Sequence, residues 1–508
     1  MLRVLHVLGS VPIIEDWTAM ISFDQAARQH AVHFVNVLRK TNALYDSATG
    51  RFNEALAAFH RDWSNIQLGQ HWAAGKLHDD LHAAELCLEY AASGSAILDA
   101  RQHPREHVHW RQRALDAARK LGRKEAEGKN LAFLATTHSL LGESRRAIEY
   151  AEEALSIARA CNDKLTEGRT LSTQGIALQV LGENPQAIAS LEQAINILRE
   201  EDDADNLNNC FSALAHVHYT SGDARRAIEY ADEALSISRR ISDQMGIANA
   251  LNFLGNAWAN LGELRRAMEF YEESLALSRA LGYRRAEGNA VGNLGIIYYD
   301  LGEYRQSIEC HERSLAIRQE IGDRRGESQN LGNLGLAWFA LDDFLRAVDY
   351  HEQSLVISRE CDDQRGIGQD LGNLGDALLA LGNPQKALEY LQESLDTFRN
   401  IGDRRSEGIT LSSLGDAFLA LEDTQTAIRY YEEAYEVAVE VGDSIEEAGA
   451  LWKTSQALAA SSSLDRAIQQ AEAALAVFEK IESPLIEITE QRLNEWKMMQ
   501  TSQLSQDS

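Results

Sequence analysis

Residues 322–361 read GDRRGESQNLGNLGLAWFALDDFLRAVDYHEQSLVISREC, and this 40-residue unit recurs in register over nine copies. Leu331 and Leu355 belong to two columns that are mostly large and apolar when every fortieth residue is read. A third column holds small residues: Ala147, Ala187, Ala227, Ala267, Ser307, Ala347, Ala387, Ala427 and Ala467. A repeat of this length, kept without insertion, indicates a solenoid of stacked units.

Each unit contains two amphipathic helical patterns, which makes the predicted fold all-α. The first places Leu331, Leu334, Gly335 and Trp338 at helical spacing, and the second places Ala347 among its apolar residues. Glycine in mid-helix costs about 1 kcal/mol of propensity, so Gly335 and its equivalents predict a close approach of the second helix. The turn between the helices holds a glycine suited to a left-handed cap at six positions: Gly142, Gly182, Gly222, Gly262, Gly302 and Gly382. Asp342, Glu422 and Ser462 replace it in three copies.

These residues resemble the tetratricopeptide repeat (TPR), whose pattern of large and small residues the unit shares. The matching residues are Leu331, Leu334, Gly335, Trp338, Ala347, His351 and Ser354. The 40-residue length and Gly-Asp linkers are most similar to Leu-Gly-Asn repeats of the Pins type and to sensor arrays of STAND signalling ATPases. The resemblance implies a right-handed α-solenoid, a TPR superhelix of antiparallel helix pairs, whose first helices line the concave side.

The repeats suggest a division of the chain. We expect a helical module in 1–79, a degenerate capping pair in 80–121, nine repeats in 122–483, a capping helix in 484–500 and a disordered tail in 501–508. Within the first module, residues 23–74 carry two helical patterns, while 1–22 fit a strand and a loop. The start is not predicted to be a signal peptide, because His6 and Pro12 interrupt its apolar run.

Composition narrows the classes of partner. The formal net charge of −28 argues against a nucleic-acid or anionic-membrane surface. No apolar run reaches the roughly 18 residues of a membrane-spanning helix. The five cysteines form no C-x-x-C pair, which favours reduced thiols and a cytoplasmic location. Acidic residues of the second helices, such as Glu149 and Glu269, are interpreted as a solvated face.

No motif predicts catalysis, a cofactor or a metal. The chain lacks a P-loop, a G-x-S-x-G elbow and H-E-x-x-H. His103 and His107 have a metal-like spacing, but Pro104 marks a helix start between them, which favours a structural or solvated role. Residues 62–72 resemble the junction that precedes the repeats in STAND proteins. If the chain is related to these proteins, it corresponds to their sensor half without the ATPase domain.

The opposite face of the first helices carries a polar ladder. Three positions of the unit recur in successive copies: the first holds arginine, the second asparagine or glutamine, and the third asparagine. The residues are Arg285, Asn289, Asn293, Arg325, Gln329, Asn333, Arg365, Gln369, Asn373 and Arg405. A carboxamide can donate to a peptide carbonyl and accept from a peptide N–H, and arginine pairs with carboxylates. These ten residues are the candidate peptide site. The alternative is a structural role, with each arginine bound to a neighbour such as Asp323 or Glu327.

Two functional hypotheses follow from these patterns. The first is a non-enzymatic interaction scaffold or sensor that binds a protein or peptide segment, possibly acidic, in the groove. The second is the recognition subunit of a split STAND-type signalling or defence ATPase, whose catalytic domain lies on another chain. Nucleic-acid binding ranks third, because no aromatic residues interleave with the arginine column and the net charge opposes it.

Overall fold

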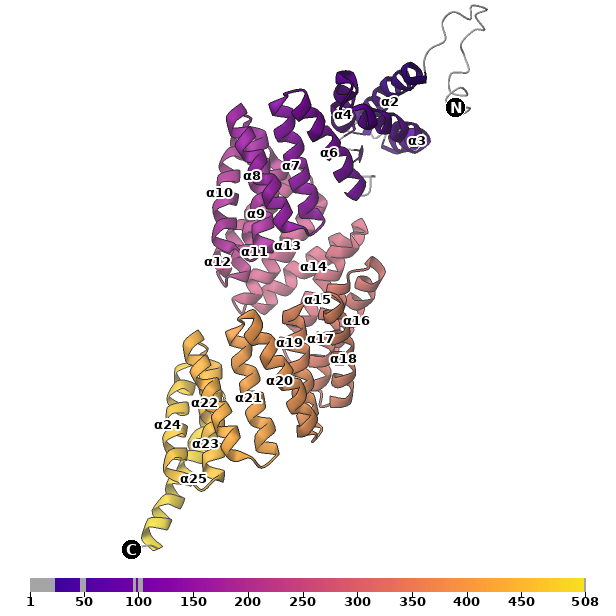
Figure 1. Cartoon of the computed structure of the whole chain (residues 1–508). Coiled ribbons are helices and arrows are strands. Elements are labelled where there is room, and N and C mark those ends of the chain that lie inside the picture. The colour runs from indigo at the N-terminus through magenta and orange to yellow at the C-terminus, as the bar shows by residue number, and fades with distance from the viewer. Residues whose placement is uncertain (1–22, 46–51, 95–96, 99–103, 507–508) are drawn as a thin grey trace, which may run out of the picture. The chain divides into compact units, whose positions relative to one another are not determined.

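The computed structural model describes residues 23–45, 52–94, 97–98 and 104–506, and in these it consists of helices. The prediction for residues 1–22 lies outside the described residues. The helices before the repeats are α2 (Phe23–Tyr45), α3 (Phe52–Lys76), α4 (Leu81–Ser93) and α6 (Pro104–Lys120). The predicted all-α solenoid is confirmed by the stacked helix pairs that follow them (Figure 1).

Nine helix pairs follow, each with an odd-numbered first helix and an even-numbered second helix. They are α7 (Lys124–Leu140), α8 (Ser144–Cys161), α9 (Lys164–Val180), α10 (Asn184–Glu200), α11 (Ala204–Thr220), α12 (Ala224–Arg240), α13 (Gln244–Asn260), α14 (Leu264–Leu281), α15 (Arg284–Asp300), α16 (Tyr304–Ile321), α17 (Arg324–Ala340), α18 (Phe344–Glu360), α19 (Gln364–Ala380), α20 (Pro384–Ile401), α21 (Arg404–Ala420), α22 (Thr424–Val441), α23 (Ser444–Ala460) and α24 (Leu464–Lys480).

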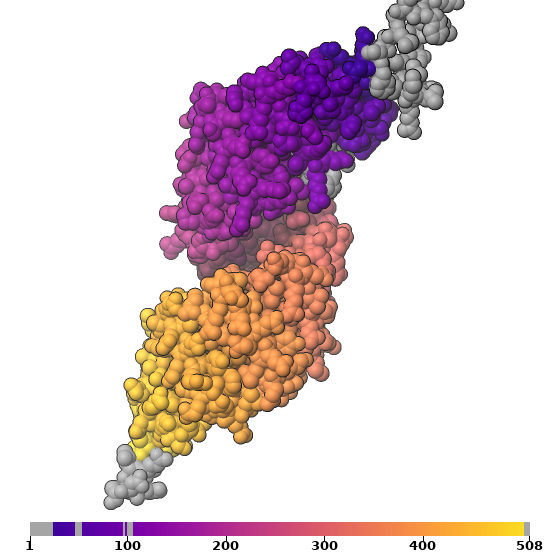
Figure 2. All heavy atoms as spheres, in the orientation of Figure 1, coloured from indigo at the N-terminus to yellow at the C-terminus, as the bar shows by residue number. Residues whose placement is uncertain are grey.

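The chain divides into two compact units, Met1–Gly246 and Ile247–Ser508. From α14 onward each helix of the second unit packs on the next, and the first helices α15, α17, α19, α21 and α23 also make contacts, each with the first helix of the following pair. Contacts between successive second helices, such as α16 and α18, are sparser in the described residues. The first helices therefore form the inner wall of this unit. Side chains fill the spaces that separate its neighbouring ribbons in Figure 1, as Figure 2 shows.

The turns confirm the predicted left-handed caps. All six predicted glycines have positive φ, from 75° at Gly382 to 80° at Gly222. Asp342, Glu422 and Ser462 adopt the same conformation, with φ of 61°, 66° and 62°. The repeat therefore requires a left-handed residue at this turn even where an L side chain makes that conformation costly.

The glycine stripe of the first helices is explained by contact with the second helices. A Cβ atom on Gly335 would lie 2.5 Å from His351 Nε2, and one on Gly415 would lie 2.3 Å from Tyr431 Cε1. Gly255, Gly295 and Gly375 approach the corresponding residues Tyr271, His311 and Leu391 at 2.5–2.7 Å. The predicted close approach is thus confirmed, and the partner is the residue sixteen positions later.

Buried glutamates join successive pairs. Glu167 is 6% exposed and accepts from Arg159 Nε of the preceding helix and from Lys164 of its own first turn, both at 2.8 Å. Burial alone would raise the pKa of this carboxyl, but the two hydrogen bonds lower it below its ordinary value. The same arrangement recurs at Glu127, Glu287 and Glu407. These acidic residues are structural and differ from the solvated ones of the second helices.

The N-terminal helices form their own apolar core around Phe34, Leu38, Tyr90 and Trp110. Helix α6 begins at Pro104, as predicted. His103 lies outside the described residues, while His107 is buried and accepts a hydrogen bond from Arg111 Nε at 3.0 Å. Burial, with the charge of Arg111, lowers the pKa of His107 to about 4. This environment fits the structural role expected for the histidine.

The last helix, α25 (Ile486–Gln506), packs on α24 through Leu493 and Trp496, which are 6% and 7% exposed. It extends six residues past the predicted end at 500, so residues 501–506 are helical where a disordered tail was expected. All five cysteines are free thiols. In the described part of the chain, no helix is both long enough and apolar enough to cross a membrane.

Candidate functional site

A cavity of about 580 Å³ lies between α17 and α19 on the inner wall of the second unit. Six of the ten predicted site residues line it: Arg325, Gln329, Asn333, Arg365, Gln369 and Asn373. Leu336 and Ile296 add apolar surface, while Ser328, Ser354 and Asp370 lie at its base, each less than 9% exposed. The predicted polar residues of two successive repeats therefore line the same cavity.

The four carboxamides of this cavity are not used by the fold. Gln329, Asn333, Gln369 and Asn373 form no side-chain hydrogen bond with any residue that the structure describes. Gln329 and Gln369 are exposed, whereas Asn333 and Asn373 are half-buried. Their donors and acceptors are therefore free to bind a ligand in the hollow.

The arginines are bound across repeats. Arg325 Nε donates to Asp363 Oδ2 at 3.0 Å, and Arg365 lies 3.1 Å from Asp403. Each aspartate also caps the next first helix, as Asp363 does for the Gly366 N–H at 3.2 Å. The acceptors thus come from the following repeat and not from Asp323 or Glu327. Because the side chains of Arg325 and Arg365 remain 68% and 67% exposed, they keep donors for a ligand.

The remaining four predicted residues do not line this cavity. Asn289 accepts a hydrogen bond from Arg318, and Asn293 donates to Asn256 Oδ1 at 2.9 Å. Arg405 is paired with Asp443 at 2.8 Å. Arg285 is exposed on α15. Asp323, the equivalent of Asp363 in the preceding repeat, instead accepts a hydrogen bond from Arg318 at 2.7 Å. Asn289 and Asn293 therefore have the structural role that was the alternative to peptide binding.

An acidic group extends the same inner face beyond the cavity. Tyr431 and Lys453 both donate to the Asp416 carboxylate, at 2.7 Å each, and Asp376 lies on α19 one repeat earlier. Burial raises the pKa of Asp376 to about 6, and the negative charge of Asp416 acts in the same direction. A hydrogen bond from Ser413 and the positive charge of Lys453 lower the pKa but do not offset the effect of burial.

This shift makes stability depend on pH. In the unfolded chain the Asp376 carboxyl has a pKa of about 3.9. Between this pH and about 6, Asp376 is therefore protonated in the folded chain and ionised in the unfolded chain. The charged form therefore costs stability as pH rises through about 6. The Asp376→Asn variant should raise the free energy of unfolding by up to about 3 kcal/mol at pH 7.5, since the pKa of Asp376 differs by about two between the folded and the unfolded chain. Hydrogen exchange of peptides from α19, compared between the variant and the wild-type chain at pH 7.5 and again at pH 4.5, should show the gain shrinking at the lower pH. An equal gain at both would contradict a charge effect.

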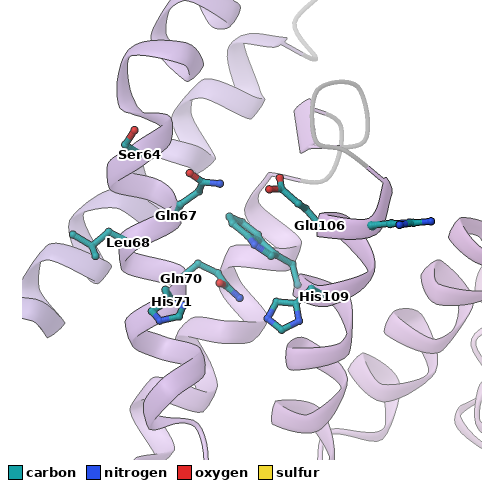
Figure 3. Close-up of a pocket in the computed structure, with 9 residues that line it drawn as sticks. Ser64, Gln67, Leu68, Gln70, His71, Glu106 and His109 are labelled. Carbon is teal, nitrogen blue, oxygen red and sulfur yellow. The ribbon is translucent and has the colours of Figure 1, made fainter.

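A second cavity, of about 550 Å³, lies between α3 and α6 (Figure 3). Its lining combines Gln67, His71, Glu106 and His109 with the indole of Trp110. Gln70 is 5% exposed, and its carboxamide extends from α3 toward His109 on α6. The sequence patterns gave no sign of this cavity, because its two walls are 40 residues apart and its residues belong to no recurrent column.

The geometry of the pairs agrees with family comparisons. The tetratricopeptide repeat model matches residues 166–240, 211–280, 286–360, 328–400, 371–439 and 406–480, and a second model of that repeat matches 129–161. The chain is a tetratricopeptide repeat protein. Membership of this family supports a role as a protein-interaction scaffold. Among curated proteins, the TPR chain has no match.

Solved structures show the same fold. The TPR chain is similar to a signal transduction ATPase with numerous domains (STAND) that carries a tetratricopeptide repeat sensor, from Pyrococcus horikoshii. The TM-score is 0.55 at 14% identity, covering 84% of this chain and 67% of that one. It is also similar to a Rap protein complexed with competence and sporulation factor. There the TM-score is 0.51 at 16% identity, covering 72% of this chain and 99% of that one. At these identities the likeness concerns the fold.

Proposed function

We propose that this chain is a non-enzymatic interaction scaffold that holds an extended peptide segment of a partner protein against α17 and α19. The observation that carries the proposal is the set of four carboxamides around one cavity that make no hydrogen bond within the described fold. A strand-like peptide presents N–H and C=O groups in alternation, and carboxamides can satisfy both kinds.

The exposed guanidinium groups suggest the charge of the segment. Arg325 and Arg365 stand at the cavity with about two thirds of their side chains exposed, each held in place by one aspartate. An acidic side chain or a terminal carboxylate on the peptide would gain charge-assisted hydrogen bonds there. The Rap structure provides an example of this fold complexed with competence and sporulation factor, although the proposal for this chain rests on its own residues.

Selection from a random dodecapeptide library on the full chain tests this proposal. A selected peptide, measured by fluorescence anisotropy, should bind the Arg325→Ala/Arg365→Ala variant roughly 30- to 1000-fold more weakly, since two lost charged hydrogen bonds at about 1–2 kcal/mol each total about 2–4 kcal/mol. The dependence of affinity on salt should also decrease. The matched control is Arg265→Ala/Arg305→Ala, which removes the same charge from exposed positions of second helices. Equal affinity in the two double variants would remove the arginines from the site, and failure to select any peptide would refute the proposal.

The split-ATPase alternative keeps the same groove and adds a catalytic partner. Affinity capture with the full chain as bait would distinguish the two, because the alternative requires a protein with a P-loop among the captured partners. A captured set without such a protein favours the scaffold alone.

A further inference from the structure

The base of the α17–α19 cavity contains a buried carboxylate with one oxygen left open. Asp370 lines the cavity and is only 4% exposed. The hydroxyls of Ser354 and Ser358 donate to its Oδ2 at 2.8 and 3.0 Å. Its Oδ1 faces Gly332, where an added Cβ would lie 3.5 Å away. Because Gly332 also lines the cavity and has no side chain, Oδ1 can be reached from the cavity.

No cation of the described residues neutralises this carboxylate at hydrogen-bond distance. His351 Nδ1 lies 3.9 Å from Oδ1, which is beyond hydrogen-bond distance. Arg325 and Arg365, the cations of the cavity rim, are directed to Asp363 and Asp403 instead. The two serine hydroxyls compensate part of the hydration that this carboxylate has lost, and a paired positive charge would stabilise it further.

The other repeats show that the fold does not require an acid here. The residues 40 apart in this column are Asn130, Thr170, Cys210, Ala250, Ala290, Asn330, Asp370, Thr410 and Ala450. One repeat earlier, Asn330 bonds the equivalent histidine, with His311 Nδ1 and Asn330 Oδ1 3.1 Å apart. Asp370 instead accepts hydrogen bonds from the two serines at Oδ2, and its Oδ1 forms no hydrogen bond with His351. The other eight repeats thus carry neutral residues in this column.

We infer that Asp370 is a specificity-determining residue that receives a cationic side chain of the bound peptide. The inference rests on the proposed function, because it names a feature of the peptide held at the same cavity. An ammonium or guanidinium group entering over Gly332 would donate to Oδ1 and supply the missing positive charge. With Arg325 and Arg365 at the rim, the preferred segment has a basic residue flanked by acidic residues.

A double-mutant cycle with a library-selected peptide tests this inference. Peptides selected on the full chain should share a lysine or arginine at one position. Replacing that residue with glutamine should weaken binding to the wild-type chain at least tenfold and change binding to the Asp370→Asn variant less than threefold. Asparagine is isosteric with aspartate and is the residue of the preceding repeat, so the variant should fold.

A second variant blocks access and keeps the charge. Gly332→Ala places a methyl group 3.5 Å from Oδ1, an ordinary contact, and alanine favours the helix. This variant should lose the preference for the basic residue, whereas Gly372→Ala, the same position one repeat later with only Ser394 nearby, should retain it. Peptide binding without coupling to Asp370 would overturn the inference and leave the proposed function intact. If no peptide is selected at all, the proposed function fails and the inference with it.

Discussion

The Gly415→Ala variant should lose about 2–3 kcal/mol of stability in the pair α21–α22. The new Cβ would lie 2.3 Å from Tyr431 Cε1 and 2.5 Å from Cδ1. The ring has no room to move, because it is 1% exposed and its hydroxyl donates to Asp416 at 2.7 Å. The gain of up to about 1 kcal/mol in helix propensity is too small to offset this clash.

Hydrogen exchange is the appropriate measurement, because a repeat array opens locally and one melting temperature does not describe it. Peptides from α21 and α22 should exchange faster in Gly415→Ala. The matched control is Gly449→Ala in α23, where an added Cβ would have no atom within 4 Å. That variant should exchange at the wild-type rate or more slowly. Equal protection in the two variants would mean that the stripe of glycines does not report helix contact.

The fold was predictable because the same physical requirement repeats in each unit. Gly415 could be assigned to a close helix contact from its column alone, and the turns could be placed from Gly142 and its equivalents. Recurrence did not show which side chain fills the space beside each glycine. It also did not predict the helical end of α25, since residues after 484 belong to no repeat.

The candidate site was predictable in part. The carboxamides Gln329, Asn333, Gln369 and Asn373 were assigned correctly to one face, because helical spacing fixes which residues share a face. The acceptor of Arg325 was not predictable, since Asp363 lies 38 residues later and reaches it only through stacking. Asp370 was missed because it sits in a column of mostly small residues on the packed side. The signal that could have indicated this residue is its negative charge, because the other residues of the column are neutral.

The second large expected effect is the loss of peptide binding when the four carboxamides are removed. The Gln329→Ala/Asn333→Ala/Gln369→Ala/Asn373→Ala variant loses up to four pairs of donors and acceptors. At about 0.7–1 kcal/mol net for each of the four carboxamides, affinity should fall roughly 100- to 1000-fold. Stability should change little, because none of the four side chains bonds to another described residue and alanine favours helix.

The affinity of this quadruple variant for a library-selected peptide tests the central claim, that the inner wall at α17 and α19 is the binding surface. The matched control replaces Glu352, Gln353, Glu389 and Gln392, exposed polar residues of the second helices α18 and α20, with alanine. We expect the control to bind like the wild-type chain and the inner-wall variant to bind at least 100-fold more weakly. Wild-type affinity in the inner-wall variant, or a comparable loss in the control, would contradict the account.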